Sequence, residues 1–77
     1  MNAIASDTTL PPATIKAVCK QMAKAIKNID AAISEVYGGD SPTANTLRSA
    51  RLPLIVYILA HGYELEMNTY RLLRAQE

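Results

Sequence analysis

The residues that could carry out catalysis are few in this chain. There is one cysteine, Cys19, and one histidine, His61, so neither a Ser–His–Asp nor a Cys–His arrangement can be assembled convincingly. Cys19 lies among isoleucines and methionine, where burial is expected to raise the pKa of its thiol and make it unreactive. Gly38-Gly39 lacks the lysine and the spacing of a phosphate-binding loop. We therefore expect no enzyme and no cofactor.

One pair of residues has the spacing of metal ligands. His61 and Glu64 are three residues apart, and this is half of the pattern found in metal-binding helical bundles. Such bundles also need inward-facing carboxylates from their other helices. The first helix offers only Asp30 and Glu35, which we place away from its apolar face. We expect no metal site, and His61 is interpreted as a boundary residue with a hydrogen bond.

Length and composition narrow the class of protein. The 77 residues suit one small domain. The core of a domain of this size rarely contributes more than about 3–5 kcal/mol to stability, so a disulfide, a bound metal or a partner chain is usually needed as well. A single cysteine cannot form an internal disulfide, so oligomerisation is the expected remedy. The formal charge of +1 argues against dominant nucleic-acid electrostatics. The longest apolar stretch, 52–60, is too short for a membrane span, and we expect a cytoplasmic location.

The first long helix is indicated by a heptad pattern. We expect residues 1–10 to form a flexible tail and 11–77 a single helical domain, whose first helix begins at Pro11-Pro12 and continues to Gly38. Its apolar residues recur at alternating spacings of four and three: Ile15, Cys19, Met22, Ile26, Ile29, Ile33 and Val36. Lysines occupy the opposite face: Lys16, Lys20, Lys24 and Lys27. We interpret them as a solvated face, with docking of acidic protein or phosphate as the alternative.

The next segment contains a helix stop and a helix start. Gly38-Gly39 can take the left-handed conformation of a C-terminal cap. Ser41 then suits an N-cap, with Pro42 in the first turn. Residues 43–52 form either a short separate helix or the first turns of a last helix that bends at Pro53. The sequence leaves both possibilities open.

The last helix is expected to run from Pro53 to Ala75. Placed at 100° intervals, its apolar residues cover about two-thirds of the circumference, more than one core contact requires. We expect Gly62 to mark a close helix crossing, and Glu66 to pair with Arg48, Arg51 or a basic residue of a partner. The excess apolar area predicts a protein-binding surface: Leu59, Tyr63, Glu66, Met67, Tyr70 and Leu73.

These features predict an all-α fold: a helical hairpin of two long helices, with a possible short middle helix. Two copies would form a dimeric four-helix bundle. The function that the pattern favours is non-enzymatic binding of protein, or self-association, as in an adaptor, inhibitor or chaperone.

The alternative is a helix-turn-helix DNA-binding regulator formed by residues 33–51. Its internal contacts would come from Ile33, Tyr37 and Leu47, although Ala44 makes a poor internal anchor. The residues left exposed to base edges and phosphates would be Thr43, Asn45, Thr46, Arg48, Ser49 and Arg51.

Overall fold

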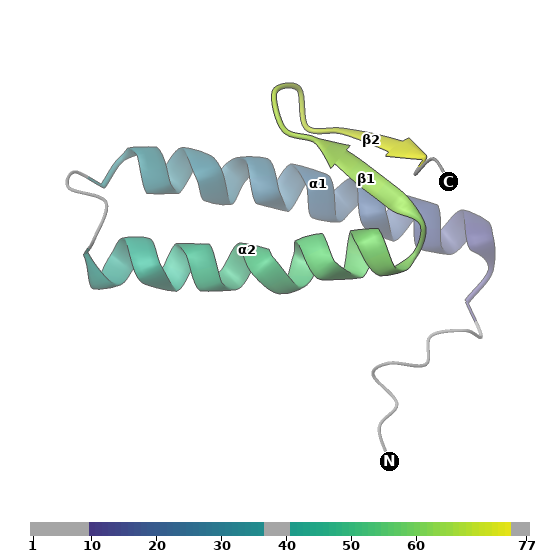
Figure 1. Ribbon diagram of the computed structural model, residues 1–77, viewed down its shortest axis with the longest axis horizontal. Coiled ribbons are helices and arrows are strands. Elements are labelled where there is room, and N and C mark those ends of the chain that lie inside the picture. Colours follow the sequence, from purple (N-terminus) through teal and green to yellow (C-terminus); the bar gives the residue numbers. More distant parts are fainter. Residues whose placement is uncertain (1–9, 37–40, 75–77) are drawn as a thin grey trace, which may run out of the picture.

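The computed structural model describes residues 10–36 and 41–74. Two helices, α1 (Pro12–Ser34) and α2 (Pro42–Ala60), are followed by two short strands, β1 (Tyr63–Glu66) and β2 (Arg71–Arg74). The helices run antiparallel beside each other, and the hairpin of β1 and β2 lies across them (Figure 1). The expected helical hairpin is therefore present in part, as the antiparallel pair α1 and α2. The fold is mostly helical but not all-α, because a two-stranded antiparallel sheet follows α2.

Helix α1 begins where the sequence predicts and buries the predicted face, but it ends at Ser34, before the expected Gly38. Pro11 is the N-cap in an extended conformation and Pro12 occupies the first helical position, where a missing N–H costs nothing. The heptad face is the inner face: Cys19 and Ile26 are fully buried, and Ile15 and Met22 pack against them. All four lysines of the opposite face are exposed. The predicted tail, apart from Leu10, and Gly38-Gly39 lie outside the described residues.

Helix α2 settles the question left open at residues 43–52. The Ser41 side chain accepts a hydrogen bond from the Ala44 N–H at 3.1 Å, so the predicted N-cap is confirmed. The helix then continues through Pro53 to Ala60. A separate short helix is therefore wrong, and residues 43–52 are the first turns of the last helix. Because Pro53 has no N–H, the helix lacks one internal hydrogen bond at this point.

The end of α2 is the main correction to the sequence analysis. The expected helix to Ala75 stops at Ala60, and Gly62 follows with a φ of +87°. The Gly62 N–H donates to the Leu59 carbonyl at 3.1 Å, as in a glycine-capped helix end. A Cβ added at Gly62 would meet nothing within 4 Å. The glycine is therefore used for its left-handed backbone, and the close helix crossing expected there is wrong.

The hairpin is built from two four-residue strands. Tyr63 pairs with Arg74 and Glu66 pairs with Arg71, and the connecting residues Met67–Tyr70 form the turn. Tyr70 closes this turn with a positive φ of 59°, and its N–H donates to the Glu66 carbonyl at 2.6 Å. In β1 the apolar side chains alternate with carboxylates, which is the two-residue period of a strand with one covered face.

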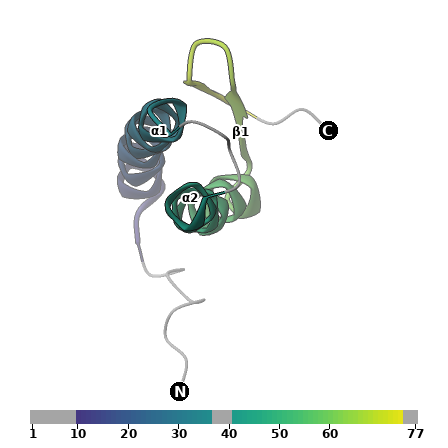
Figure 2. The same ribbon diagram turned by 90° about the vertical axis from the view of Figure 1, so that its left-hand side faces the viewer.

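The core lies where the two helices and the hairpin meet. Strand β1 contacts α2 and β2 contacts α1, so the hairpin spans the groove between the helices (Figure 2). Cys19, Ile26 and Ile58 are its fully buried centre. Four residues of the hairpin segment are packed against this centre: Tyr63, Leu65, Tyr70 and Leu72. Neither described helix is both long and apolar enough to cross a membrane.

Candidate functional site

The outer face of α2 carries a row of exposed apolar side chains. Leu52, Val56 and Leu59 are 60%, 55% and 54% exposed, and their spacing of four and three places them in one row along the helix. No charged residue occurs from Leu52 to Ala60. The opposite side of the same segment is also apolar, because Leu54, Ile55, Tyr57 and Ile58 belong to the core. This part of α2 therefore has more apolar surface than its own chain covers.

A groove between α2 and β1 extends this row towards the hairpin. The groove has a volume of about 350 Å³. It is lined by Ile55, Ile58, Leu59, Glu64, Leu65 and Met67. Met67, in the hairpin turn, is 44% exposed. Because Leu59 belongs both to the row and to the groove, the exposed residues form one continuous region. We call Leu52, Val56, Leu59 and Met67 the apolar surface.

Only part of the site predicted from the sequence is assembled here. Leu59 and Met67 belong to the apolar surface, whereas Leu73 is 37% exposed on the face of the hairpin that also carries Glu64. Tyr63 and Tyr70 are packed against the core. Leu52 and Val56 were missed as members of the site. Their spacing within a charge-free segment was the available signal.

Glu66 has a local partner. Its carboxylate accepts a hydrogen bond from the Thr69 hydroxyl in the hairpin turn. Arg51, one of the two arginines expected to pair with Glu66, is bound to Asp30 instead. The prediction that Glu66 lies in a helical apolar arc is wrong because residues 63–66 form a strand.

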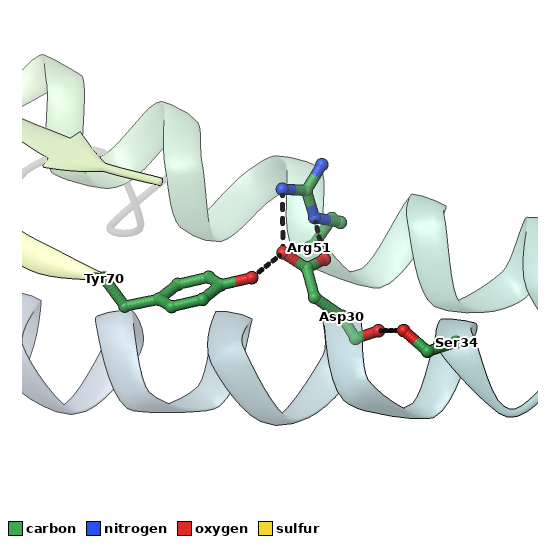
Figure 3. Close-up of polar contacts among 4 residues, drawn as sticks. All are labelled: Asp30, Ser34, Arg51 and Tyr70. Atoms are coloured by element: carbon green, nitrogen blue, oxygen red, sulfur yellow. Dashed lines mark hydrogen bonds and ion pairs between the residues drawn. The ribbon is translucent and has the colours of Figure 1, made fainter. Parts of the chain in front are cut away.

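A polar cluster of Asp30, Arg51 and Tyr70 joins the three parts of the fold (Figure 3). Arg51 Nε lies 2.7 Å from Asp30 Oδ1, and Arg51 Nη2 donates to Asp30 Oδ2 at 3.3 Å. The Nε contact is an ion pair without hydrogen-bond alignment. Tyr70 donates its hydroxyl proton to Asp30 Oδ2 at 2.7 Å. Asp30 thus faces α2 and the hairpin, and its expected place away from the helix contact is wrong.

The cluster changes the acidity of its phenol. The hydrogen bond that Tyr70 donates to Asp30 raises the pKa of Tyr70, and desolvation and the negative charge of Asp30 act in the same direction. All three effects favour the protonated phenol. The Tyr70 hydroxyl therefore acts as a donor that fixes the hairpin turn to α1.

The residues of the helix-turn-helix interpretation lie in the first half of α2. Thr43, Asn45, Thr46, Arg48 and Ser49 are exposed, but Arg51 is bound to Asp30. Ala44 is fully buried. Tyr37 lies outside the described residues. Helices of a helix-turn-helix cross at about 90–120°, whereas α1 and α2 lie side by side in both views (Figures 1 and 2).

The potential catalytic and metal-binding residues have structural partners. His61 Nδ1 lies 2.9 Å from the Tyr57 carbonyl oxygen, which can only accept, so Nδ1 carries the proton in this bond. Cys19 is fully buried, and burial raises the pKa of its thiol. Within residues 10–36 and 41–74, no three side chains of the metal-binding types gather at one place.

Comparison of the chain with protein-family models, with curated proteins and with solved structures gave no match. What the chain does must therefore be argued from the surfaces described above. Among them, the apolar surface is the most unfavourable to leave in contact with water, since it exposes four large apolar side chains in one region.

Proposed function

We propose that the chain is a small, non-enzymatic protein-binding protein, and that its apolar surface packs against a second copy of the chain. One observation carries this proposal: Leu52, Val56 and Leu59 form an exposed row on a helix whose other side already contributes to the core. A contiguous exposed apolar patch of this kind is typical of protein-binding sites. The site thus lies on α2 and the hairpin turn, in place of the longer helix expected from the sequence.

The energy available from this surface is large for so small a domain. Burying the exposed part of each leucine or valine side chain contributes roughly 1 kcal/mol. Three such side chains together contribute roughly 3 kcal/mol, compared with about 5–15 kcal/mol for the whole stability of a typical domain. Met67 adds an unbranched side chain that can adapt to the shape of the opposing surface.

The row is suited to a copy of itself. If two α2 helices pack antiparallel about a twofold axis near Val56, Leu52 of one copy faces Leu59 of the other. Such a contact is self-complementary, as a twofold interface requires. The segment from Leu52 to Ala60 carries no charge that would repel its counterpart. Counting α1 of each copy, such a dimer contains four helices, with the two α2 helices at its centre.

Sedimentation equilibrium of the full chain at micromolar concentrations tests the proposal. The wild-type protein is expected to be a dimer. Val56→Lys introduces a charge at the centre of the row and should weaken dimerisation by at least about tenfold. Because Val56 is exposed within one copy, circular dichroism should show unchanged helix content.

Leu73→Lys is the matched control, since it makes the same change of charge at an exposed leucine outside the row. It should leave the dimer intact. A wild-type protein that stays monomeric, or two variants that weaken the dimer equally, would contradict the proposal.

A further inference from the structure

A second hollow lies on the opposite side of the hairpin, between α1 and β2. It has a volume of about 310 Å³ and is lined by residues of both elements: Lys20, Ala23, Lys24, Tyr70, Arg71 and Leu72. It shares no residue with the apolar surface or with the groove beside it. The two regions can therefore be tested separately.

Three cationic residues line this hollow. Lys20 and Lys24 are one turn apart on the exposed face of α1, and Arg71 reaches it from β2, more than forty-five residues later in the chain. The lining contains no carboxylate. None of the three cations forms an ion pair with another residue in the described part of the chain. Gathering them costs repulsion that an anion would remove.

The floor of the hollow is apolar. Ala23 is almost completely buried, and Leu72 and the Tyr70 ring are partly buried beside it. The Tyr70 hydroxyl is already bound to Asp30, which fixes the turn immediately before Arg71. The hydrogen bond therefore restrains the backbone next to Arg71. The hollow therefore combines cationic residues, which can bind an anion, with apolar residues, which can contact an organic group.

We infer that this hollow binds a small organic phosphate. The phosphoryl group would lie among Lys20, Lys24 and Arg71, and its organic group would lie on Leu72 and Ala23. Two negative charges match three cations better than the single charge of a carboxylate, and arginine binds phosphate oxygens in a bidentate manner. The volume is at the lower end of the range for small-molecule pockets, which excludes a large ligand.

Titration of the ¹⁵N-labelled full chain at low salt with phenyl phosphate, followed by amide chemical shifts, tests the inference. Saturable shifts are expected at residues 20–24 and 70–72, with weaker binding as sodium chloride is added. Inorganic phosphate should bind at the same residues, but less tightly, because it leaves the floor uncovered. Neutral phenol should not saturate.

Single charge removals distinguish a built site from general attraction to a basic surface. Lys24→Gln and Arg71→Gln should each weaken phenyl phosphate binding by about tenfold. Lys16→Gln and Lys27→Gln remove the same charge from the same helix outside the hollow, and should change binding by less than about twofold. All four side chains are exposed, so none of the substitutions should change the fold, and circular dichroism can check this.

Equal weakening by all four variants would overturn the inference, since it would mean diffuse attraction only. Phenyl phosphate shifts that do not saturate would overturn it as well. Equal affinity for phenyl phosphate and inorganic phosphate would overturn the assignment of an organic phosphate, because the apolar floor would then contribute nothing to binding. Because none of these residues belongs to the apolar surface, failure here is distinguishable from failure of the proposed dimer.

Discussion

The two helices differ in where their apolar side chains lie. Helix α1 has one polar and one apolar face: its lysines are exposed, and its heptad residues are buried or partly buried. The second half of α2 has apolar residues on both sides, one facing the core and one facing outward. Amphipathic patterning such as that of α1 indicates only that a helix packs in a fold. A charge-free helix that is covered on one side indicates a surface available for binding.

The largest effect should come from the buried side of this comparison. Ile26→Ala removes a fully buried side chain at the centre of the core and should destabilise the chain by about 2–5 kcal/mol. Leu52→Ala truncates an exposed side chain on α2 and should change the stability of one copy by less than about 1 kcal/mol. Urea denaturation at a protein concentration that keeps the chain monomeric measures both. Similar losses for the two variants would mean that the outer row of α2 is covered within one copy.

The next largest effect should come from the polar cluster that joins the helices. Asp30→Ala leaves Arg51 and the Tyr70 hydroxyl without their shared acceptor, and should cost about 2 kcal/mol. Glu35→Ala, which removes an exposed carboxylate at the C-cap of α1, is the control and should cost less than about 0.5 kcal/mol. Chemical denaturation gives the free energies of unfolding.

A smaller effect is expected at the junction of helix and hairpin. Gly62→Ala places a Cβ on a backbone with a φ of +87° and should destabilise the chain by about 1 kcal/mol. The added methyl meets no neighbour, so the cost is conformational and not steric. A stabilising Gly62→Ala, measured by thermal denaturation, would indicate that α2 continues beyond Ala60 and that the two-sided part of the helix is longer.

The smallest effect should come from the phenol of the cluster. Tyr70→Phe removes one hydrogen bond and should lower the stability slightly at neutral pH. Because the folded state raises the pKa of Tyr70, this stability is fully present below the ordinary phenol pKa of about 10 and is lost as pH rises above it. The difference in stability between wild type and Tyr70→Phe should therefore shrink at alkaline pH in parallel urea titrations. A constant difference would place the phenol outside the cluster.

Local signals in the sequence were sufficient for the helix pair. The heptad spacing gave the buried face of α1, and the Ser41-Pro42 pair marked the start of α2 through its capping chemistry. Both signals depend on neighbours within about one turn or on a repeat that continues over several turns. The structure of these segments follows from such local preferences.

The hairpin was missed because its signals are short. Apolar residues are so frequent after Pro53 that a helical projection places them all around a helix, which hides the alternation of Tyr63, Glu64, Leu65 and Glu66. Gly62, at the end of α2, was the visible stop signal. The terminal strands contain only four residues each, too few for a periodic pattern to be distinguished from chance.

The polar cluster could not be predicted from spacing. Asp30 binds partners that are 21 and 40 residues away along the chain, and both contacts depend on how the helices and the hairpin pack. The same is true of the hollow lined by Lys20, Lys24 and Arg71, since Arg71 reaches it only because the chain turns back at residues 67–70. Such contacts arise from the tertiary arrangement.

A sheet of two strands has no interior strand, so each strand of the hairpin has one backbone edge without a ladder partner among residues 10–36 and 41–74. Edges of this kind are templates on which further chains can add and grow into fibrils. Both strands carry charged residues. In β1 every second residue is charged, Glu64 and Glu66, and in β2 the two end residues are charged, Arg71 and Arg74. Identical charges would be stacked in a growing in-register fibril, and their mutual repulsion opposes that growth. The four charges therefore disfavour the stacking of identical hairpins along these edges.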